Sequence, residues 1–387
     1  MISVTHPAPA PDLICLSHLR WNFVFQRPQH LMTRCARDRR VFFVEEPIFQ
    51  PGVAAHLLIE QSDTVRVVVP HLPHGISSEQ AIVAQRHLLQ QLIEAERMSS
   101  YVLWYYTPMA LPFTDRLSPV AVVYDCMDEL SAFKGAPAVL TAREAELMRR
   151  ASLVLTGGQS LFEAKRHLHS NIHPFPSSVD VAHFAQARRV TKEPDDQAAL
   201  PRPRLGFFGV IDERMDLPLL DAVAAARPDW QLVMLGPVVK IDSESLPQRA
   251  NIHYLGSKRY EDLPQYIAGW DVALLPFARN EATRFISPTK TPEYLAAGRP
   301  VVSTSIRDVV RPYGKQGLVR IADDAQAFVQ ACTAAMAEDP LKRITQADAF
   351  LRQTSWDGTW TRIRAKLDEV LRRPDDGPTA AQDATAV

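Results

Sequence analysis

The stretch "FISPTKTPEYLAAGRPVV", residues 285–302, has the form of a short helix that ends at Gly298 and leads into an apolar strand. Lys290 lies at the start of that helix, where the aligned backbone dipoles favour an anion over a cation. Free backbone N–H groups and a lysine side chain at one point together make an anion site. The stretch therefore indicates that a negatively charged ligand binds beside Lys290.

Two starts of this helix are compatible with the sequence. If Ser287 caps the helix, Pro288 takes the first helical position and Lys290 lies in the first turn. If Thr291 is the cap, Lys290 lies just outside the helix and Glu293 only complements the dipole. Both alternatives keep Lys290 at the helix start, so both predict the anion site.

Short apolar runs alternate with helical patterns on both sides of this stretch. The runs are continuous, which is typical of parallel strands covered by helices on both faces. In the first half the expected strands are 12–18, 41–46, 65–70, 101–106, 120–125 and 152–157, and the expected helices are 28–37, 79–98, 138–150 and 159–168. The second half repeats the alternation with "RLGFFGV", "WQLVMLG", "NIHYLG", "DVALLPF" and "PVVSTS". The predicted fold class is α/β, with two doubly wound domains in tandem.

Length and composition set the expected domain boundaries. A chain of 387 residues exceeds the size of one growing core, so two domains are expected, 1–185 and 204–358. The polar, proline-bearing segment 186–203 is the expected linker, and the tail 373–387 is expected to be disordered. Ligands of doubly wound sheets bind at the carboxyl ends of the strands, so the cleft between the domains is the expected site.

Charge and cysteine content restrict the partners and the compartment. The formal net charge is −1, which gives no reason to expect a nucleic-acid partner. The four cysteines show no metal-ligand spacing and are expected to be reduced, and no metal is expected. The start lacks the features of a signal peptide and no apolar run is long enough to span a bilayer. We expect a cytoplasmic protein.

Common nucleotide and nucleophile motifs are missing. The sequence has no G-x-x-x-x-G-K-S/T loop and no G-x-G-x-x-G after its first strand. "GGQSLF" (157–162) has Phe162 where a nucleophile elbow needs its second glycine. Ser160 is therefore interpreted as a helix N-cap.

Four segments carry a resemblance to a known family. "SPTKTPEYLAAGRPVV" resembles the S-P-x-K-x-x-E-Y-x-A-A-G-x-P-V segment of nucleotide-sugar glycosyltransferases with the GT-B fold, both the retaining group-1-type family and the xanthan-type glucuronosyltransferases. "LSHLRWNFVFQRPQHLM", "HPFPSSVDVAHF" and "GFFGVIDERMDLPLL" agree in order. The resemblance implies two Rossmann-like domains facing each other across a cleft. It also implies that the last helix, about 359–372, packs back on the first domain.

The resemblance implies a donor site in the C-terminal domain. Glu293 would accept hydrogen bonds from the ribose hydroxyls, and Arg214 resembles a basic residue directed at the donor phosphates. The alternative for Arg214 is a solvated arginine of the charged turn "DERMD". Gly209 ends its strand and would let the backbone approach the ligand. The diphosphate would be held by Ser287, Pro288, Thr289 and Lys290.

The N-terminal domain would hold the acceptor. "VVYDCMDELSAF" places Asp125 and Asp128 at a strand end, and Asp128 matches the catalytic base of the xanthan-type enzymes. A positioned carboxylate can remove the proton of an attacking hydroxyl, and the alternative is an acidic turn residue. Retaining enzymes usually carry a second glutamate eight residues before the one matching Glu293, and here that position is Phe285, which favours inversion.

The first strand-end loop combines aromatic and basic residues, and several of them are candidates for contact with acceptor or donor: His18, Trp21, Arg27 and His30. Basic residues continue along the following helix, at Arg34, Arg37, Arg39 and Arg40. They form either a solvated helix face or a patch on anionic lipid headgroups, which would place the protein peripherally on the inner face of the cell membrane.

The leading hypothesis is a metal-independent glycosyltransferase without a cofactor. It would move a sugar from a nucleoside-diphosphate donor, most simply a UDP-sugar, to a hydroxyl of a glycan or lipid-linked glycan in polysaccharide or glycoconjugate biosynthesis. The leaving diphosphate would be stabilised by Lys290 and Arg214. The alternatives are a sugar-nucleotide epimerase of the same fold and a non-catalytic partner in a glycan-assembly complex.

Overall fold

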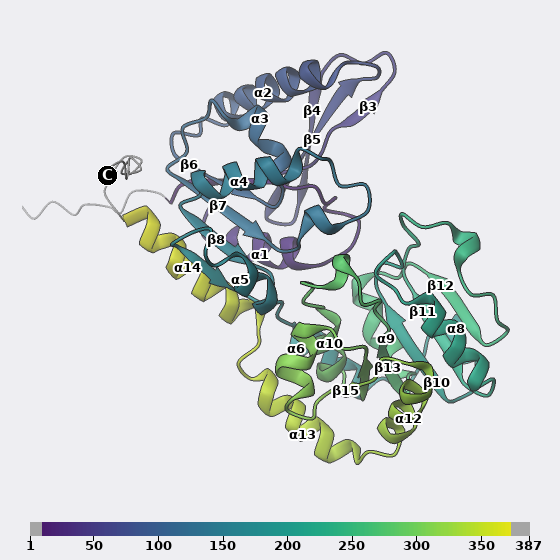
Figure 1. Cartoon of the computed structure of the whole chain (residues 1–387). Helices are drawn as coiled ribbons and strands as arrows, with labels where there is room; N and C mark the ends of the chain where they lie inside the picture. Colours follow the sequence, from purple (N-terminus) through teal and green to yellow (C-terminus); the bar gives the residue numbers. More distant parts are fainter. Residues whose placement is uncertain (1–9, 373–387) are drawn as a thin grey trace, which may run out of the picture.

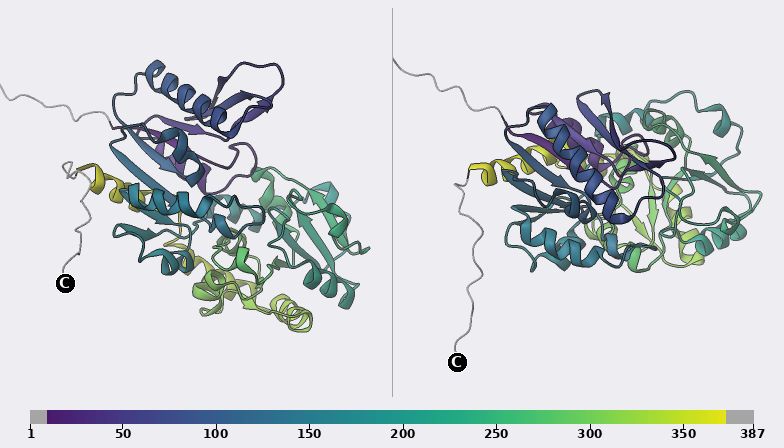
Figure 2. Two further views of the ribbon diagram at one scale, coloured as in Figure 1. Left: turned by 45° about the horizontal axis from the view of Figure 1, so that its top comes forward. Right: turned by 90° about the horizontal axis from the view of Figure 1, so that it is seen from above.

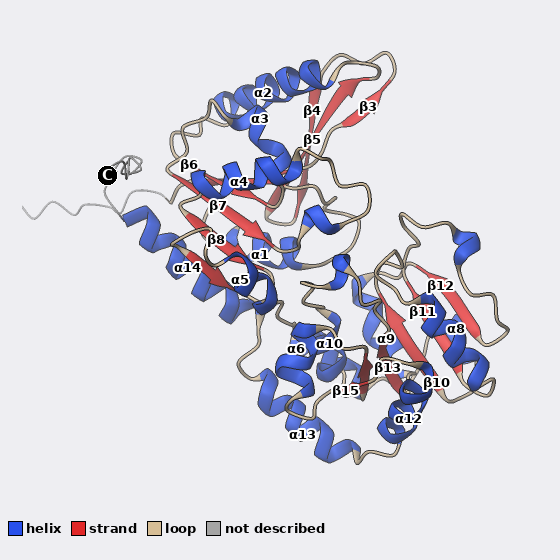
Figure 3. Ribbon diagram, in the orientation of Figure 1, coloured by secondary structure: helices blue, strands red, loops and turns tan. Residues whose placement is uncertain are grey.

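A computed structural model of the chain describes residues 10–372 and shows two α/β domains side by side. Each domain is built on one sheet with helices packed against both of its faces (Figure 3). The predicted α/β class with two doubly wound domains is confirmed. The predicted tail, 373–387, lies outside the described residues.

The N-terminal sheet is centred on β1, all of whose residues are buried. Within the described residues its order is β3-β5-β2-β1-β6-β7-β8-β9, and all of these neighbours pair in parallel. Their apolar runs become central strands because both faces are covered by helices. The strands are β1 (Asp12–Leu16), β2 (Val41–Val44), β3 (Ile48–Gln50), β5 (Val65–Pro73), β6 (Tyr101–Tyr105), β7 (Ala121–Cys126), β8 (Leu153–Thr156) and β9 (Ile172–Pro174).

One edge of this sheet carries an excursion that the sequence patterns do not indicate. β4 (His56–Ser62) pairs antiparallel with β5 and is mostly exposed, and the short β3 pairs with β5 farther along the strand. The excursion lies beside α2 (Ser78–Ala95) at the outer end of the domain (Figure 1). The sequence does not predict this excursion, because neither the β3 nor the β4 segment has the spacing of apolar residues that is typical of a buried strand.

The helices of the N-terminal domain agree in place with the predicted ones. α2 begins with a capping box, since the Ser77 side chain accepts from the backbone N–H of Gln80 and the Gln80 side chain accepts in return from the backbone N–H of Ser77. The other helices of this domain are α1 (Arg27–Cys35), α3 (Leu111–Thr114), α4 (Leu140–Arg150) and α5 (Gln159–Lys165).

The last helix, α14 (Trp356–Arg372), crosses back from the second domain and lies along the N-terminal domain (Figure 2). Four of its residues belong to the core beneath the N-terminal sheet: Trp356, Trp360, Ile363 and Leu367. The first domain therefore depends on both ends of the described chain for its core.

The C-terminal sheet is parallel throughout the described residues, in the order β12-β11-β10-β13-β14-β15. Its strands are β10 (Arg204–Phe208), β11 (Gln231–Leu235), β12 (Ile252–Gly256), β13 (Val272–Leu275), β14 (Val301–Ser303) and β15 (Arg320–Ile321). Its helices are α8 (Leu217–Ala226), α9 (Leu263–Ala268), α10 (Lys290–Ala296), α11 (Arg307–Val309), α12 (Ala325–Met336) and α13 (Pro340–Leu351).

The chain enters the C-terminal domain before residue 185. Phe175 is part of the N-terminal core, whereas Val179 and Phe184 already belong to the C-terminal core. The segment expected to be a linker, 186–203, is packed: it follows α6 (Val181–Phe184) and contains α7 (Asp195–Ala198). The side chain of Gln197 is buried, donating to the carbonyl of Tyr266 and accepting from the indole of Trp270, so its amide anchors this polar segment to the C-terminal domain.

Candidate functional site

The cleft between the two domains contains a cavity of about 480 Å³. Its N-terminal wall is the loop that follows β1, residues 21–26. Its C-terminal wall lies at the carboxyl ends of β10, β11 and β12, where doubly wound sheets bind ligands. Lys290 and Glu293 of α10 complete the lining. The cavity has the size of a small-molecule site.

The helix that carries Lys290 begins at that residue, and its N-cap, Thr289, makes no side-chain capping bond. Both predicted caps, Ser287 and Thr291, are therefore wrong. Pro292 lies in the first turn, where the ring breaks no helical hydrogen bond because first-turn N–H groups have no partner within the helix. Lys290 stays at the helix start, as both alternatives required.

Only one of the three residues before Lys290 lines the cavity, namely Thr289. Ser287 instead contacts the N-terminal domain, since a Cβ built on Gly158 would lie 2.9 Å from Ser287 Cβ. Pro288 accepts a hydrogen bond from the backbone of Thr291 at 3.3 Å. The predicted diphosphate contacts of Ser287 and Pro288 are therefore less direct than those of Thr289 and Lys290.

The position of the Lys290 side chain explains why residue 209 is a glycine. Its φ is +137°, and a Cβ at this position would lie 2.1 Å from Lys290 Cε and 2.8 Å from Lys290 Nζ. A larger residue would displace the lysine from the cavity. Burial lowers the pKa of Lys290, while Glu293 acts in the opposite direction.

Glu293 is buried, and its Oε2 atom has no hydrogen-bond partner in the described chain. Burial raises the pKa of Glu293 to about 7, although Lys290 lowers it in part. A buried carboxylate oxygen without a donor needs either a proton or a ligand that donates to it. The position is thus suited to a hydroxyl-bearing ligand.

Arg214 is paired more closely than the sequence indicates. Its guanidinium donates to both oxygens of Asp212, with Nη2 to Oδ2 at 2.7 Å and Nε to Oδ1 at 2.9 Å. Phe133 of the N-terminal domain lies 5.5 Å from its guanidinium carbon. Arg214 therefore reaches the interface between the domains, and its Nη1 atom makes no hydrogen bond within the described residues.

Asp128 follows β7 and lies among cations from both domains. Burial raises the pKa of its carboxyl to about 6, and Arg214, Arg27 and Lys290 lower it in part. A carboxylate with a pKa in this range is ionised at neutral pH and is still a useful base. The loop that carries Asp128 is held by an ion pair to α5, because Lys165 Nζ contacts Glu129 Oε2 at 2.7 Å.

Arg27 and Asp125 do not face the cleft. The Arg27 guanidinium donates to both carboxylate oxygens of Asp125 at 2.8 to 3.1 Å and to the carbonyl of Phe175 at 2.6 Å. Both side chains are buried. They form a structural ion pair within the N-terminal domain, which corrects the predicted contact with an acceptor.

The remaining candidates of the first loop have different surroundings. His18 lies near Lys240 of the C-terminal domain, its Nδ1 atom has no partner in the described chain, and burial lowers its pKa to about 4. Trp21 lines the cavity, and its indole donates to Ser62. His30 is buried and stacks on Trp356 of α14, which corrects its predicted place in the site.

The basic face of α1 is matched by acidic residues. Arg34 and Arg37 both contact Asp357 of α14, at 3.1 and 2.7 Å. Arg40 is paired with Asp12 at 2.5 Å. The structure thus favours the solvated, paired face over a patch on anionic lipid. Within residues 10–372, no helix is long and apolar enough to cross a membrane.

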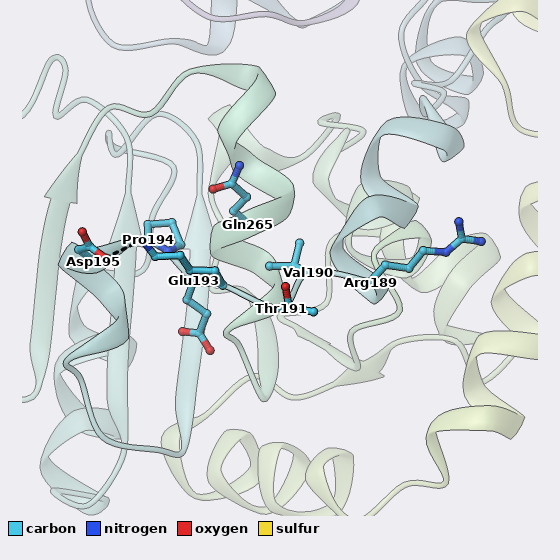
Figure 4. Close-up of a pocket in the computed structure, with 8 residues that line it drawn as sticks. Arg189, Val190, Thr191, Glu193, Pro194, Asp195 and Gln265 are labelled. Carbon is cyan, nitrogen blue, oxygen red and sulfur yellow. Dashed lines mark ion pairs between the residues drawn. The ribbon is translucent and has the colours of Figure 1, made fainter.

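Two features lie apart from this site. A hollow at residues 189–195, beside Gln265 of α9, contains none of the predicted site residues (Figure 4). Among the described residues, no group of three or more His, Cys, Asp or Glu side chains has the geometry of a metal site.

Sequence reasoning missed Tyr260 and Lys240. Tyr260 lines the cavity, stacks on His183 at 4.2 Å and approaches Phe25 at 4.7 Å, so it connects the two domains. Lys240 lies 5.4 Å from the ring of Phe133. The sequence signal for either is its place in the loop after a strand of the C-terminal sheet, which many surface residues share.

The sheets, the crossing helix α14 and the interdomain cavity define a GT-B fold. The family described as "Glycosyl transferases group 1" matches residues 202–338, which lie in the C-terminal domain. The group-1 part of the sequence resemblance is thereby confirmed, and the xanthan-type part stays a prediction.

The chain is similar to several known proteins. TuaH of Bacillus subtilis (strain 168), provisionally named a teichuronic acid biosynthesis glycosyltransferase, is 24% identical over 248 residues, which cover 58% of this chain and 62% of the relative. The match thus spans less than two thirds of that relative's length. Sucrose-phosphate synthase from Thermosynechococcus elongatus superposes with a TM-score of 0.71 at 14% identity, covering 93% of this chain and 99% of the other. Anabaena Alr3699/HepE, in complex with UDP and glucose, gives a TM-score of 0.65 at 15% identity, with 93% and 100% covered.

Proposed function

We propose that this protein is a glycosyltransferase that moves a sugar from a UDP-sugar to a hydroxyl group of a glycan or lipid-linked glycan in polysaccharide biosynthesis. The observation that carries the proposal is that Lys290 and Glu293 both line one cavity between the two domains. A cation and an unsatisfied carboxylate side by side match the diphosphate and ribose of a nucleotide sugar.

The choice of UDP is supported by proteins of the same fold. HepE is described in complex with UDP and glucose, and an E. coli trehalose-6-phosphate protein is described as bound with UDP-2-fluoro glucose. The latter superposes with a TM-score of 0.69 at 11% identity, covering 94% of this chain and 99% of the other. The name of TuaH supports a role in making a polysaccharide.

The proposed reaction uses charges that the protein already holds in place. The diphosphate gains negative charge as it leaves, and Lys290 lies where it can stabilise that charge without a divalent cation. Asp128, on the opposite side of the cleft, removes the proton of the acceptor hydroxyl as that hydroxyl attacks C1. The sugar is thereby transferred with inversion.

The test is a thermal-shift panel of UDP, GDP, ADP and dTDP. UDP at about 100 times its dissociation constant should stabilise the wild type by about 2.7 kcal/mol. Lys290→Met keeps the bulk of the side chain and should weaken UDP binding by about 10- to 100-fold, because it removes a charge-assisted hydrogen bond. Lys315→Met, at an exposed lysine, is the matched control. A UDP shift that survives in Lys290→Met would reject this placement of the diphosphate.

A further inference from the structure

The C-terminal domain contains a cavity of about 460 Å³ that has no lining residue in common with the donor cavity. Pro203, Asp271 and Pro300 line it, and these residues directly precede β10, β13 and β14. The C-terminal end of α12 and the start of α13 form its outer wall, at the lower end of the domain in Figure 1. The cavity therefore lies at the amino ends of the strands, whereas the donor site lies at the carboxyl ends.

Arg299 is held at this cavity by the end of α10. Gly298 has a φ of +75°, its backbone N–H donates to the carbonyl of Leu295, and the backbone N–H of Arg299 donates to the carbonyl of Tyr294. This pair of bonds is the Schellman arrangement, in which a left-handed residue ends the helix. The Nη1 atom of Arg299 also donates to the carbonyl of Trp270 at 2.9 Å. Both the backbone and the guanidinium of Arg299 are thus fixed in place.

One edge of the Arg299 guanidinium has no partner. Its Nε atom is buried without a hydrogen bond, and its Nη2 atom makes none within the described residues. Nε and Nη2 are the two parallel donors with which an arginine binds a carboxylate or a phosphate group. Because a buried charged group without a partner destabilises the fold, this edge favours an anionic ligand.

Two further arginines line the same cavity. Arg343 Nη2 donates to the carbonyl of Gly298 at 3.0 Å, whereas its Nε atom is buried without a partner. Its Nη1 atom is 3.7 Å from Glu338 Oε2, which is too far for a hydrogen bond. Arg202 is half-exposed. Burial lowers the pKa of Arg299, and the charges of Arg343 and Arg202 lower it further, so the three cations lie close enough to repel one another.

The carboxylates around the cavity already have cationic partners. Asp271 accepts from Arg202 at 2.7 Å, and Glu338 accepts from Arg320 at 2.7 Å. The charged lining groups, the groups that pair with them or act on their pKa, and the ion pair beside Gly298 comprise six arginines and five carboxylates: Arg188, Arg202, Arg204, Arg299, Arg320 and Arg343 against Glu193, Asp271, Glu338, Asp339 and Asp348. The surplus is one positive charge, which corresponds to the unpaired Arg299.

The size and the other walls of the cavity restrict the ligand further. A volume of about 460 Å³ is that of a small-molecule site and exceeds what a phosphate ion alone would fill. Pro203, Pro300, Met336 and Pro340 supply apolar surface beside the arginines. The cavity is thus suited to a phosphate group that carries a small organic part.

We propose that this cavity binds a small phosphomonoester, with Nε and Nη2 of Arg299 donating to two phosphate oxygens and with Arg343 and Arg202 supplying further positive charge. The organic part lies against Pro300 and Met336. The inference is independent of the proposed function, because no residue of the donor site takes part in this binding.

The test is isothermal titration calorimetry on the full chain in saturating UDP, which keeps the donor site occupied. The probes are glycerol 3-phosphate, ribose 5-phosphate, glucose 6-phosphate and inorganic phosphate. At least one ester should bind more than about tenfold tighter than inorganic phosphate, because its organic part adds contacts. Lys290→Met should keep this binding, since Lys290 lies at the other end of α10.

Two variants test the position of the phosphate group. Arg299→Lys keeps the charge and a donor for the carbonyl of Trp270 but cannot present two parallel donors, so it should weaken ester binding by about tenfold or more. Arg202→Gln, at the half-exposed wall, should weaken it by about threefold and leave the fold intact. Arg352→Lys, at an exposed arginine of the same domain outside the cavity, is the matched control.

The outcomes separate this inference from the proposed function. Ester binding that is unchanged in Arg299→Lys or in Arg202→Gln would overturn the inference. Equal affinity for inorganic phosphate and for every ester would overturn the assignment to a phosphomonoester. No binding of any probe, while UDP still raises the melting temperature, would overturn the inference and leave the proposed function standing. Ester binding as expected without any response to UDP would support the inference and count against the proposed function alone.

Discussion

At Glu293, burial and a missing hydrogen-bond donor both disfavour the charged carboxylate. The native pKa of about 7 exceeds the ordinary value of 4.5, so the folded chain holds this proton to higher pH than the unfolded chain does. The native state therefore loses stability as the pH rises from about 4.5 to about 7. In a cleft without ligand, this residue makes the protein less stable at neutral pH than it would otherwise be.

Glu293→Gln should consequently stabilise the ligand-free protein at pH 8, by up to about 3 kcal/mol, and by much less at pH 5. Urea unfolding at both pH values measures the difference. Glu261→Gln alters an exposed carboxylate of the same cavity and should show no such pH dependence. A wild type that is the more stable protein at pH 8 would contradict this account. The same variant should bind UDP more weakly, because the ribose loses its acceptor.

Asp128 gives a prediction about rate. Since the proposed base acts only when ionised and its pKa is about 6, kcat/KM should fall as the pH drops below about 6. Asp128→Asn should lower kcat by about 10²- to 10⁴-fold and keep the UDP thermal shift. Release of UDP from a UDP-sugar measures this, with Asp195→Asn in the outlying hollow as control. Unaltered turnover in Asp128→Asn would show that Asp128 is not the base.

At the scale of elements, local patterns predicted strands and long helices well and side-chain partners poorly. The run "DLICLSH" reads as a buried strand because its composition is apolar throughout, and β1 is buried throughout. No local sequence pattern indicates that Arg27 pairs with Asp125, because the two residues are far apart in the sequence and meet only in the folded domain. Ser160 was expected to cap its helix, yet α5 has Gly158 as its N-cap, and the N–H of Ser160 donates to Asp308 of the C-terminal domain instead.

Lys165, at the C-terminal end of α5, supports the loop that carries the proposed base, Asp128. Lys165 Nζ contacts Glu144 at 2.8 Å and Glu129 at 2.7 Å, and all three side chains are largely buried. Lys165→Met leaves two buried carboxylates without their cation and should cost about 3 to 5 kcal/mol in unfolding free energy.

Chemical denaturation measures this cost, and Lys165→Arg should recover part of it. Lys366→Met, in an exposed pair on α14, should cost less than about 1 kcal/mol. Equal costs for the two methionine variants would show that the buried cluster does not anchor the loop.

For the whole molecule, the alternation of strands and helices was sufficient to predict two doubly wound domains, because each βα unit needs its neighbours to bury the strand. The boundary was harder to predict. The segment after Phe175 is polar in composition, yet it packs on the second domain through partners such as Tyr266 that are remote in the sequence. The contacts that bring the domains together are likewise absent from any local pattern.

Those contacts lead to a prediction about closure of the cleft. Asp308 Oδ1 accepts from the backbone N–H of Ser160 at 3.0 Å, and Arg307 and Arg311 pair with Glu163 at 3.0 and 3.1 Å. The exposed pairs should contribute little, whereas Asp308→Ala leaves a buried N–H group without a partner.

Since both domains line the donor cavity, a smaller closed population should weaken the apparent affinity for UDP in proportion, by up to about tenfold for Asp308→Ala. Small-angle scattering should show a larger radius of gyration for this variant without UDP than for the wild type. Asp324→Ala removes an exposed N-cap within the C-terminal domain, at α12, and should lower stability slightly but change neither the radius nor the affinity. If both variants weaken UDP binding equally, the effect is a general loss of stability, and Asp308 does not control the closed arrangement of the two domains.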